Sequence, residues 1–205
     1  MKPEDVSIFH ITDVENLPGI IESGGLLSDA EMANREPAAV IGYSHIKLRR
    51  LNEIRVECCA DRFVGEFVPF YFCPRSPMLY TINMGNTGRE PGCQRTIVHL
   101  VSTVHAGVSL GRSWSISDGN AGSFSAMFSC SLTALGELNW QLLNANDWHG
   151  QTFQKSAEFL VLEFFPWTRI TRLACHNQEI AAQVGSLLQS AQHRPLLEIR
   201  PDWYY

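Results

Sequence analysis

The amino-acid sequence predicts one α+β domain that spans residues 1–205. Segments with strand patterns and segments with helix patterns are mixed irregularly, without the run of β-α-β units that is typical of a doubly wound sheet. No internal repeat and no linker-like stretch divides the chain. With 205 residues and 45% hydrophobic content, the chain can bury a sizeable core.

The first predicted elements are a short strand at residues 6–11 and a helix directly after it. Thr12 and Glu15 have the spacing of a capping box, in which a Thr side chain caps the first turn and a Glu side chain binds back. Pro18 is tolerated only in the first turn, so we expect the regular helix to begin near Asn16. A Gly-Gly pair then ends it.

The middle of the chain is predicted to carry two strands and two short helices. Pro69 should place its strand at a sheet edge or a bulge, because proline cannot donate to a ladder. The basic helix is either a solvated charged face or an anion clamp for phosphates. In order, we expect a surface loop or weak helix at 26–39, the basic helix at 44–51, the strand at 67–72, a helix from Met78, a Gly-rich loop at 83–92 and a strand at 96–101.

The second half of the chain begins with a predicted strand and turn and ends with another strand. The elements expected there are a strand at 114–117, a turn at 118–120, helices at 121–128 and 132–143, a polar loop at 144–153, a strand at 170–174, a helix at 180–190 and a strand at 196–199. Between the loop and the strand at 170–174 lies an apolar run from Phe159 that Pro166 stops, and this run is the strongest strand candidate in the chain.

One carboxylate, Glu158, stands at the head of that apolar strand. Side chains alternate faces along a strand, so Glu158 shares a face with Leu160 and Leu162. A carboxylate on an apolar face costs several kcal/mol unless it is paired or hydrated. Two interpretations are therefore open: a sheet-edge Glu that points into solvent, or a catalytic carboxylate held at a cleft by a rigid strand. Glu163 is expected on the opposite face.

His10 lies where the first strand gives way to a helix start. The histidine could be a half-buried strand residue, or it could form a hydrogen bond with a ligand seated at the strand end. Residue patterns alone leave both interpretations open.

Composition and cysteine usage limit the classes of function. The net charge of −5 argues against bulk nucleic-acid binding but allows a local basic cleft. No apolar run approaches the ~18 residues of a membrane span, and the first residues lack a signal-peptide pattern, so the prediction is a cytoplasmic protein without membrane contact. The six cysteines lack zinc-site spacing and are predicted to be reduced thiols that serve as small apolar residues. Dinucleotide-fold, P-loop and hydrolase motifs are absent.

Four stretches together resemble the DarT family of DNA ADP-ribosyltransferase toxins. The third of them is the most specific, because it is long and free of repeats. The stretches are FHIT at 9–12 with Asn16 and Leu17, IGYSHIKLRRL at 41–51, VPFYFCPRSPMLY at 68–80, and KSAEFLV at 155–161 with FFPW at 164–167.

The resemblance implies a fold, an activity and partners. The fold would be the compact ADP-ribosyltransferase fold related to poly-ADP-ribose polymerases, with mostly antiparallel sheets and peripheral helices. The activity would be transfer of ADP-ribose from NAD⁺ to a base in single-stranded DNA, usually thymidine and in a sister branch guanosine, which would block replication. The partner would be a macrodomain antitoxin, DarG. We expect a monomer and no metal.

The resemblance also assigns roles to residues by position. It implies Glu158 as the catalytic glutamate and Arg49 as the essential arginine, although without an alignment the choice between Arg49 and Arg50 is open. The residues implied for NAD⁺ are His10, Thr12, Asn16, Tyr43, Arg49 and Tyr71, and those for DNA are Arg75, Met78, Asn120, Trp148 and Lys155. Where Asn120 stands, the family often has a histidine, and an amide cannot take up a proton near neutral pH.

The implied chemistry is physically consistent with these side chains. Cleavage of the nicotinamide–ribose bond leaves positive charge on the ribose, which the Glu158 carboxylate would stabilise, while Arg49 would bind the pyrophosphate. An unstacked base is cheaper to reach in a single strand than in a duplex. Two alternatives stay open: the same fold with an RNA or protein acceptor, and a binding module for NAD⁺ or nucleic acid without catalysis.

Overall fold

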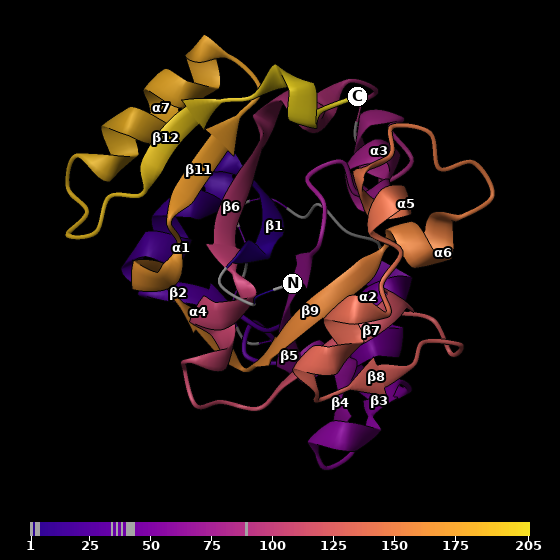
Figure 1. The fold of residues 1–205 in the computed structure, drawn as a ribbon. Helices are drawn as coiled ribbons and strands as arrows, with labels where there is room; N and C mark the ends of the chain where they lie inside the picture. The colour runs from indigo at the N-terminus through magenta and orange to yellow at the C-terminus, as the bar shows by residue number, and fades with distance from the viewer. Residues whose placement is uncertain are drawn as a thin grey trace.

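The computed structural model describes residues 2, 5–33, 35, 37, 39, 44–88 and 90–205. Strands β1 to β12 and helices α1 to α7 are shown in Figure 1. The strands are β1 (Ser7–Asp13), β2 (Gly25–Leu27), β3 (Arg55–Val56), β4 (Arg62–Phe63), β5 (Phe67–Tyr71), β6 (Ile97–Thr103), β7 (Trp114–Asn120), β8 (Phe128–Ser129), β9 (Ala157–Leu162), β10 (Phe164–Pro166), β11 (Arg172–Cys175) and β12 (Leu196–Ile199). The helices are α1 (Leu17–Glu22), α2 (Ser44–Asn52), α3 (Pro77–Asn83), α4 (Val104–Val108), α5 (Trp140–Asn144), α6 (Thr152–Lys155) and α7 (Gln178–Leu188).

One eight-stranded sheet organises the molecule, with the strand order β12-β11-β6-β1-β5-β9-β7-β8. Every neighbouring pair runs antiparallel except β11 and β12, which run parallel and are connected through α7. Two-stranded sheets, β10 with β2 and β3 with β4, complete the framework. The predicted α+β class with mostly antiparallel strands is therefore confirmed.

The large sheet is weakly joined between β1 and β5. These strands share one registered pair, Phe9 with Tyr71, whereas β1 pairs with β6 along its whole length and β5 with β9 along its whole length. Pro69 thus lies in an interior strand rather than at an edge, but it lies outside this short ladder, so its missing N–H interrupts no pairing with β1. A seam in the sheet leaves side chains of both strands free to line a cavity.

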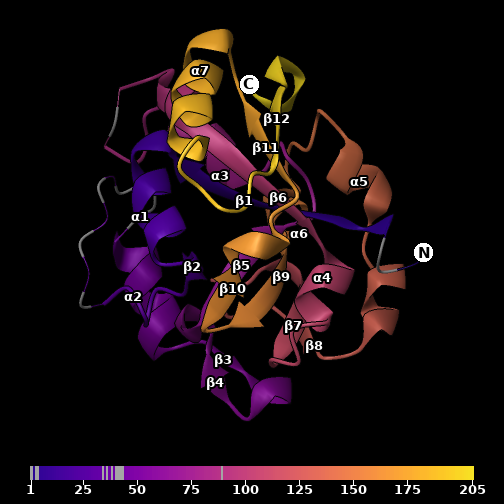
Figure 2. The same ribbon diagram turned by 90° about the vertical axis from the view of Figure 1, so that its left-hand side faces the viewer.

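Helices cover both faces of the sheet. Figure 2 shows α1 and α2 on one side of β5 and β9, and α4 and α5 on the other. The main core cluster includes Leu17 of α1, Val184 of α7 and Phe159 of β9, all fully buried. The rings of Phe70 and Phe165 lie 4.7 Å apart between their centroids. In the part of the chain that the structure describes, no helix has both the length and the apolar character of a membrane span.

Most of the predicted elements in the N-terminal half and near the C-terminus are confirmed. In these segments the periodic spacing of apolar residues is long or is bounded by turn-forming residues, so it predicts the element well. The confirmed elements are β1, α1, α2, β5, α3, β6, β7, β9, β11, α7 and β12, each shifted by a few residues at most. Among the described residues of 26–39, those at 29–33 form turns as a surface loop requires, but Leu26 and Leu27 belong to β2, which the sequence did not predict.

The predicted turn at 118–120 and the predicted helix at 121–128 are both wrong. Strand β7 continues to Asn120, and the chain returns through turns to β8. Gly119 lies in this strand because the ring of Phe153 packs where its Cβ would be, at 2.4 Å. Ser117 also contributes to the strand, since its Oγ accepts a hydrogen bond from the backbone N–H of Glu158 at 3.1 Å. Tertiary contacts thus override turn-forming residue types.

Four element boundaries also differ from the predictions. Asp13, not Thr12, caps the first turn, because its side chain accepts from the backbone N–H of Glu15 at 3.1 Å. Glu163 has a φ of 64° and separates β9 from β10, so the apolar run is two strands. The predicted helix at 132–143 is a 3-10 helix at Leu132–Gly136 followed by α5, which Asn139 caps. The predicted loop at 144–153 is shorter than expected, because α6 already begins at Thr152.

The prediction of six reduced cysteines is wrong for two of them. Cys58 and Cys130, 72 residues apart in sequence, form a disulfide. Cys73, Cys59, Cys93 and Cys175 are free, and Cys73 and Cys175 are buried in the main core cluster. A pairing over this sequence separation carries no local signal, so the sequence could not have indicated it.

His99 gives the fold a specific pH dependence. Its buried ring binds the Pro74 carbonyl through Nε2 at 2.9 Å, and burial lowers its pKa from 6.5 to about 4. In the unfolded chain the ring takes up a proton near pH 6.5, whereas the folded protein takes it up only near pH 4. We therefore expect the free energy of unfolding to fall by up to about 3 kcal/mol as the pH is lowered from 6.5 to 4.

This dependence is measured by urea unfolding across that pH range. His99→Gln, which retains an N–H donor for Pro74, should have a shallower slope than the wild type. The exposed His149→Gln should retain the wild-type slope. Equal slopes for the wild type and His99→Gln would contradict the assignment.

Candidate active site

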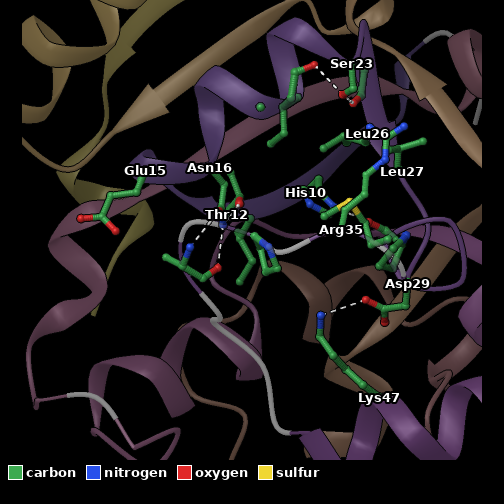
Figure 3. Close-up of a pocket in the computed structure, with 18 of the residues that line it drawn as sticks. His10, Thr12, Glu15, Asn16, Ser23, Leu26, Leu27, Asp29, Arg35 and Lys47 are labelled. Atoms are coloured by element: carbon green, nitrogen blue, oxygen red, sulfur yellow. Dashed lines mark hydrogen bonds and ion pairs between the residues drawn. The ribbon is translucent and has the colours of Figure 1, made fainter.

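A cavity of about 860 Å³ opens beside the seam between β1 and β5. Its walls come from β1, α1, β2, α2 and β5, and Figure 3 shows the side chains that point into it. Three cations, Arg35, Lys47 and Arg50, line the cavity together with acidic residues that include Asp29. Lys47 Nζ donates to Asp29 Oδ1 at 2.9 Å. The cavity therefore combines apolar walls with charged groups, as small-molecule sites commonly do.

Glu158 is buried directly behind this cavity. It lies on β9 between β5 and β7, opposite Tyr71 in the register, and is 2% exposed. Its Oε1 accepts from Arg50 Nη1 at 3.2 Å and from the backbone N–H of Ala121 at 3.0 Å, and its Oε2 accepts from Arg50 Nη2 at 3.0 Å. The solvent-exposed interpretation of Glu158 is therefore wrong, and the carboxylate is held in one position by three donors.

Arg50 is the cationic partner of that carboxylate. Helix α2 carries it into the interior, where it is 9% exposed, and the two-pronged contact with Glu158 matches guanidinium to carboxylate geometry. Burial acts to lower the pKa of Arg50, but the charge and hydrogen bonds of Glu158 outweigh it and raise the pKa. Two of the five guanidinium N–H groups are used by Glu158. The remaining donors are available to a ligand in the cavity that Arg50 lines.

Arg49 occupies a different place from the one that the resemblance implied. Its Nη1 donates to the Gly122 carbonyl at 3.3 Å, and its guanidinium lies 5.6 Å from the ring centroid of Phe124. It is not among the residues that line the cavity. Adjacent residues on a helix point about 100° apart, and the two guanidinium groups accordingly have different partners. The geometry thus places Arg50, and not Arg49, beside Glu158.

Helical spacing could have identified Arg50 from the sequence. Ile46 and Lys47 stand four and three residues before Arg50, and all three line the cavity. Side chains at these spacings share one helix face. The backbone N–H of Ala121 could not be predicted, because a backbone donor carries no residue-type signal.

His10 and Tyr71 face the cavity from the two sides of the seam. The Pro69 carbonyl can only accept, so His10 Nδ1 carries the proton in their 2.8 Å contact. Burial lowers the pKa of His10 below its usual 6.5, which leaves the ring neutral and its Nε2 an acceptor. Burial likewise raises the pKa of Tyr71, with a further contribution from the charge of Glu158, so the phenol keeps its proton.

Thr12 and Asn16 also line the cavity, but their polar groups are engaged with the protein. Asn16 Nδ2 donates to Thr12 Oγ1 at 3.1 Å and to the Ala39 carbonyl at 2.9 Å. Its Oδ1 accepts from the Ala39 backbone N–H at 2.9 Å. Asn16 therefore holds the loop at residue 39 against β1. Tyr43, also implied for NAD⁺, lies outside the described residues.

The residues implied for DNA are distributed over four places. Met78 lines the cavity from α3. Arg75 and Trp148 meet at the C-terminal Tyr205, where the Arg75 guanidinium lies 4.5 Å from the Tyr205 ring centroid and Trp148 Nε1 donates to the Tyr205 hydroxyl at 3.1 Å. Asn120 closes its own turn, since its Oδ1 accepts from the Gly122 backbone N–H at 2.8 Å.

Lys155 does not point toward a DNA surface. It is 1% exposed, and its ammonium donates to the carbonyls of Leu142, Leu143 and Ala145 at 3.3, 2.7 and 2.9 Å. These carbonyls belong to the end of α5 and the residue after it. Lys155 therefore fixes the end of α5 to α6, directly before Glu158, and has no donor left for a phosphate.

Comparison with known proteins identifies the family. The family model described as "ssDNA thymidine ADP-ribosyltransferase, DarT" matches residues 9–205. The chain belongs to the DarT family. A DNA ADP-ribosyl transferase of Thermus sp. (strain 2.9) is 37% identical over 208 residues, which cover 99% of this chain and 98% of that protein.

Solved structures of DarT proteins agree with this membership. Thermus sp. 2.9 DarT in complex with ADP-ribosylated ssDNA matches with a TM-score of 0.92 at 36% identity, over 100% of this chain and 99% of that one. A DNA ADP-ribosyl transferase–DNA ADP-ribosyl glycohydrolase fusion protein of Thermosipho africanus is 34% identical over 83 residues, which are 40% of this chain and 20% of that protein. The expected ADP-ribosyltransferase fold is thus the fold of this DarT member.

In this DarT-family chain, the placement of His10 predicts a defined pH profile. Protonation would put a hydrogen on Nε2 and remove its capacity to accept from a ribose hydroxyl of NAD⁺. Because the pKa of His10 is lowered, we expect kcat/KM for NAD⁺ to stay level near neutral pH and to fall only below pH 6.5. His10→Ala should lower kcat/KM by about tenfold, the worth of one hydrogen bond. In His10→Gln, which cannot titrate, the acid fall should disappear; an unchanged fall would assign it to another group.

Lys155 is expected to be a stability residue of this DarT member rather than a DNA contact. Lys155→Met should lower the free energy of unfolding by about 3 kcal/mol, because three carbonyls lose a charged donor. Urea unfolding measures this loss. The salt dependence of binding to single-stranded DNA should stay as in the wild type, since each lost phosphate contact would reduce the slope of log K against log salt by about 0.7. A reduced slope would restore Lys155 as a DNA contact.

Proposed function

We propose that this chain is the toxin of a toxin–antitoxin pair and transfers ADP-ribose from NAD⁺ to a thymine base in single-stranded DNA. The observation that carries the proposal is the Arg50–Glu158 pair behind an 860 Å³ cavity. A fixed carboxylate next to a cavity of this size is the arrangement that cleavage of a nicotinamide–ribose bond requires. The chain acts as one domain over residues 1–205, which the eight-stranded sheet that contains both β1 and β12 supports.

In the first step the C–N bond between ribose and nicotinamide breaks. Its electron pair leaves with nicotinamide, and the ribose becomes an oxocarbenium-like cation. Glu158 stabilises this cation electrostatically, because three donors keep the carboxylate in place. His10 Nε2 accepts from a ribose hydroxyl and orients the sugar. Lys47 and Arg35, which line the same cavity, face the negative pyrophosphate in place of Arg49.

In the second step the thymine base attacks the anomeric carbon. N3 is the ring nitrogen of thymidine that carries a proton, and it must lose this proton when the new C–N bond forms. The carbonyls that flank N3 accept from the free N–H groups of Arg50, which lowers the cost of removing that proton. Glu158 is hydrogen-bonded to the same guanidinium and takes the proton. The products are free nicotinamide and an ADP-ribosylated base.

The acceptor strand is single-stranded because its target base must leave the stack, and an unpaired base does so at little cost. Trp148, Tyr80 and Tyr205 form an aromatic group, with the Tyr80 ring centroid 5.5 Å from that of Trp148 and 5.1 Å from that of Tyr205. Together with Arg75 they offer ring faces and a cation to neighbouring bases. Met78 connects this group to the cavity along α3.

The partner of this toxin is a macrodomain antitoxin of the DarG type. The Thermosipho relative, whose chain joins a DNA ADP-ribosyl transferase to a DNA ADP-ribosyl glycohydrolase, supports this pairing. NAD⁺ and DNA are intracellular, so the proposed place of action is the cytoplasm. A modified template base blocks replication because a bulky ADP-ribose prevents base pairing.

The test combines purified protein, NAD⁺ and a thymidine-containing single strand, read by mass spectrometry. We expect one ADP-ribose on the thymidine strand, less on the duplex and none on a strand whose thymidines are replaced by deoxycytidine. Product on guanosine, RNA or protein alone would overturn the proposed acceptor. Expression in bacteria should be toxic for the wild type and tolerated for Glu158→Ala, whereas toxicity of both would overturn the link between transfer and toxicity.

A further inference from the structure

Three cysteine sulfurs lie close together outside the 860 Å³ cavity. The sulfurs of Cys58, Cys59 and Cys130 all lie within 4.8 Å of one another. Cys58 and Cys130 are exposed and disulfide-bonded, while Cys59 is buried with a free thiol 3.2 Å from Cys130 Sγ. A cavity of about 170 Å³ adjoins the three, so that a small disulfide can reach them.

We propose that Cys58, Cys59 and Cys130 form a reversible thiol–disulfide exchange site that tethers the β7–β8 hairpin to the segment that follows α2. The donor set favours this chemistry over a closed metal site. In the described part of the chain, the cluster has three sulfurs and no histidine or carboxylate as a fourth ligand. A disulfide in an intracellular protein is also typically transient or redox-sensing.

Formation of the Cys58–Cys130 bond requires an oxidant, and a small-molecule disulfide such as oxidised glutathione can serve. The sulfurs of Cys58 and Cys130 each give up a proton and one electron and form one S–S bond. The oxidant's S–S bond breaks, and its two sulfurs take up the two electrons and two protons as thiols. The reverse reaction with the reduced thiol opens the tether.

Cys59 supplies an internal exchange partner. Its thiol donates to the Trp114 carbonyl at 3.3 Å, and burial raises its pKa, so it stays protonated while Cys58 and Cys130 are linked. When Cys59 Sγ attacks Cys130 Sγ, the Cys58–Cys130 bond breaks and a Cys59–Cys130 bond forms. Cys58 leaves as a thiolate and takes the proton that Cys59 lost. This exchange needs no external oxidant.

The tether matters because the hairpin reaches the active site. Strand β8 is registered with β7 through two residue pairs, which makes it a marginal ladder. The loop between these strands supplies the Ala121 N–H to Glu158 and the Gly122 carbonyl to Arg49. Cys130 directly follows β8, so its bond to Cys58 anchors the hairpin on the side of α2 and β3.

The test maps disulfides in the full chain after treatment with oxidised glutathione or with dithiothreitol. The wild type should give a Cys58–Cys130 peptide, Cys58→Ser should give Cys59–Cys130, and Cys130→Ser should give neither. Cys93→Ser, which removes a thiol outside the cluster, is the matched control and should behave as the wild type. Both exposed thiols remaining alkylatable after oxidation would overturn the exchange site.

Hydrogen exchange of residues 121–129 tests the tether. We expect the amides of the hairpin loop to exchange about tenfold more slowly in the oxidised than in the reduced wild type. In Cys130→Ser, the exchange rates should be the same under oxidising and reducing conditions. A disulfide that leaves hairpin exchange unchanged would overturn the tether. Oxidation should also change the rate of transfer to the oligonucleotide several-fold in the wild type and in Cys93→Ser, but not in Cys130→Ser. This last readout rests on the proposed function, whereas mapping and exchange decide the cysteine site even if no transfer occurs.

Discussion

Glu158→Gln is expected to lower kcat for transfer of ADP-ribose to single-stranded DNA by about 10³-fold, while KM for NAD⁺ changes little. The substitution keeps the size of the side chain and removes the charge that stabilises the oxocarbenium-like ribose. A loss in kcat with an unchanged KM is the signature of an interaction made only in the transition state. Single-turnover assays with a labelled thymidine oligonucleotide measure the effect.

Folding must be separated from chemistry in this variant. An amide opposite Arg50 leaves a buried guanidinium without its counter-charge, which costs about 3–5 kcal/mol in comparable cases. The double variant Arg50→Gln with Glu158→Gln removes both charges and should recover part of that stability while staying inactive. Glu163→Gln is the matched control, because Glu163 directly follows the same strand, is partly exposed and pairs with Arg112 at 3.0 Å. Residual transfer within tenfold of the wild type in a folded Glu158→Gln would contradict a catalytic role.

The sequence predicted the strand that carries Glu158 but not the donors around its carboxylate. Glu158 was found because a charge at the head of an apolar strand is unusual and because the flanking residues match a known family. Arg50 binds the Glu158 carboxylate although it lies 108 positions away in the sequence. Residue type and periodicity do not predict such a distant partner. The Ala121 N–H is still less predictable, since every residue except proline has one.

The hairpin at residues 114–130 shows where local patterns fail. Asp118, Gly119 and Asn120 are turn-forming types, yet they extend β7 because Phe153 and the Glu158 backbone pack against this strand. Propensity is a weak preference that such contacts override. Tertiary contacts also decide the place of Lys155, which the family resemblance implied for DNA but whose ammonium is buried against three carbonyls. Elements with strong periodic patterns, such as α7, needed no tertiary information.

Arg50→Lys is expected to reduce transfer by about 10²-fold, whereas Arg49→Lys should reduce it by no more than about threefold. Both variants keep the charge, so they compare geometry alone. A lysine at position 50 cannot hold both oxygens of Glu158 and offer further donors to the base. The comparison decides which of two adjacent arginines the chemistry needs, and it is measured as kcat with saturating NAD⁺ and oligonucleotide.

The remaining function of Arg49 then follows from its contacts. Its guanidinium connects α2 to the Gly122 carbonyl and to Phe124, whose side chain is 70% exposed. Loss of these contacts should loosen the β7–β8 loop and act on KM for the DNA strand rather than on kcat. Phe124→Ala should give the same KM effect as Arg49→Lys, and the two should not add, because they remove one interaction. A severe kcat loss in Arg49→Lys together with a mild one in Arg50→Lys would reverse the assignment and return the pyrophosphate role to Arg49.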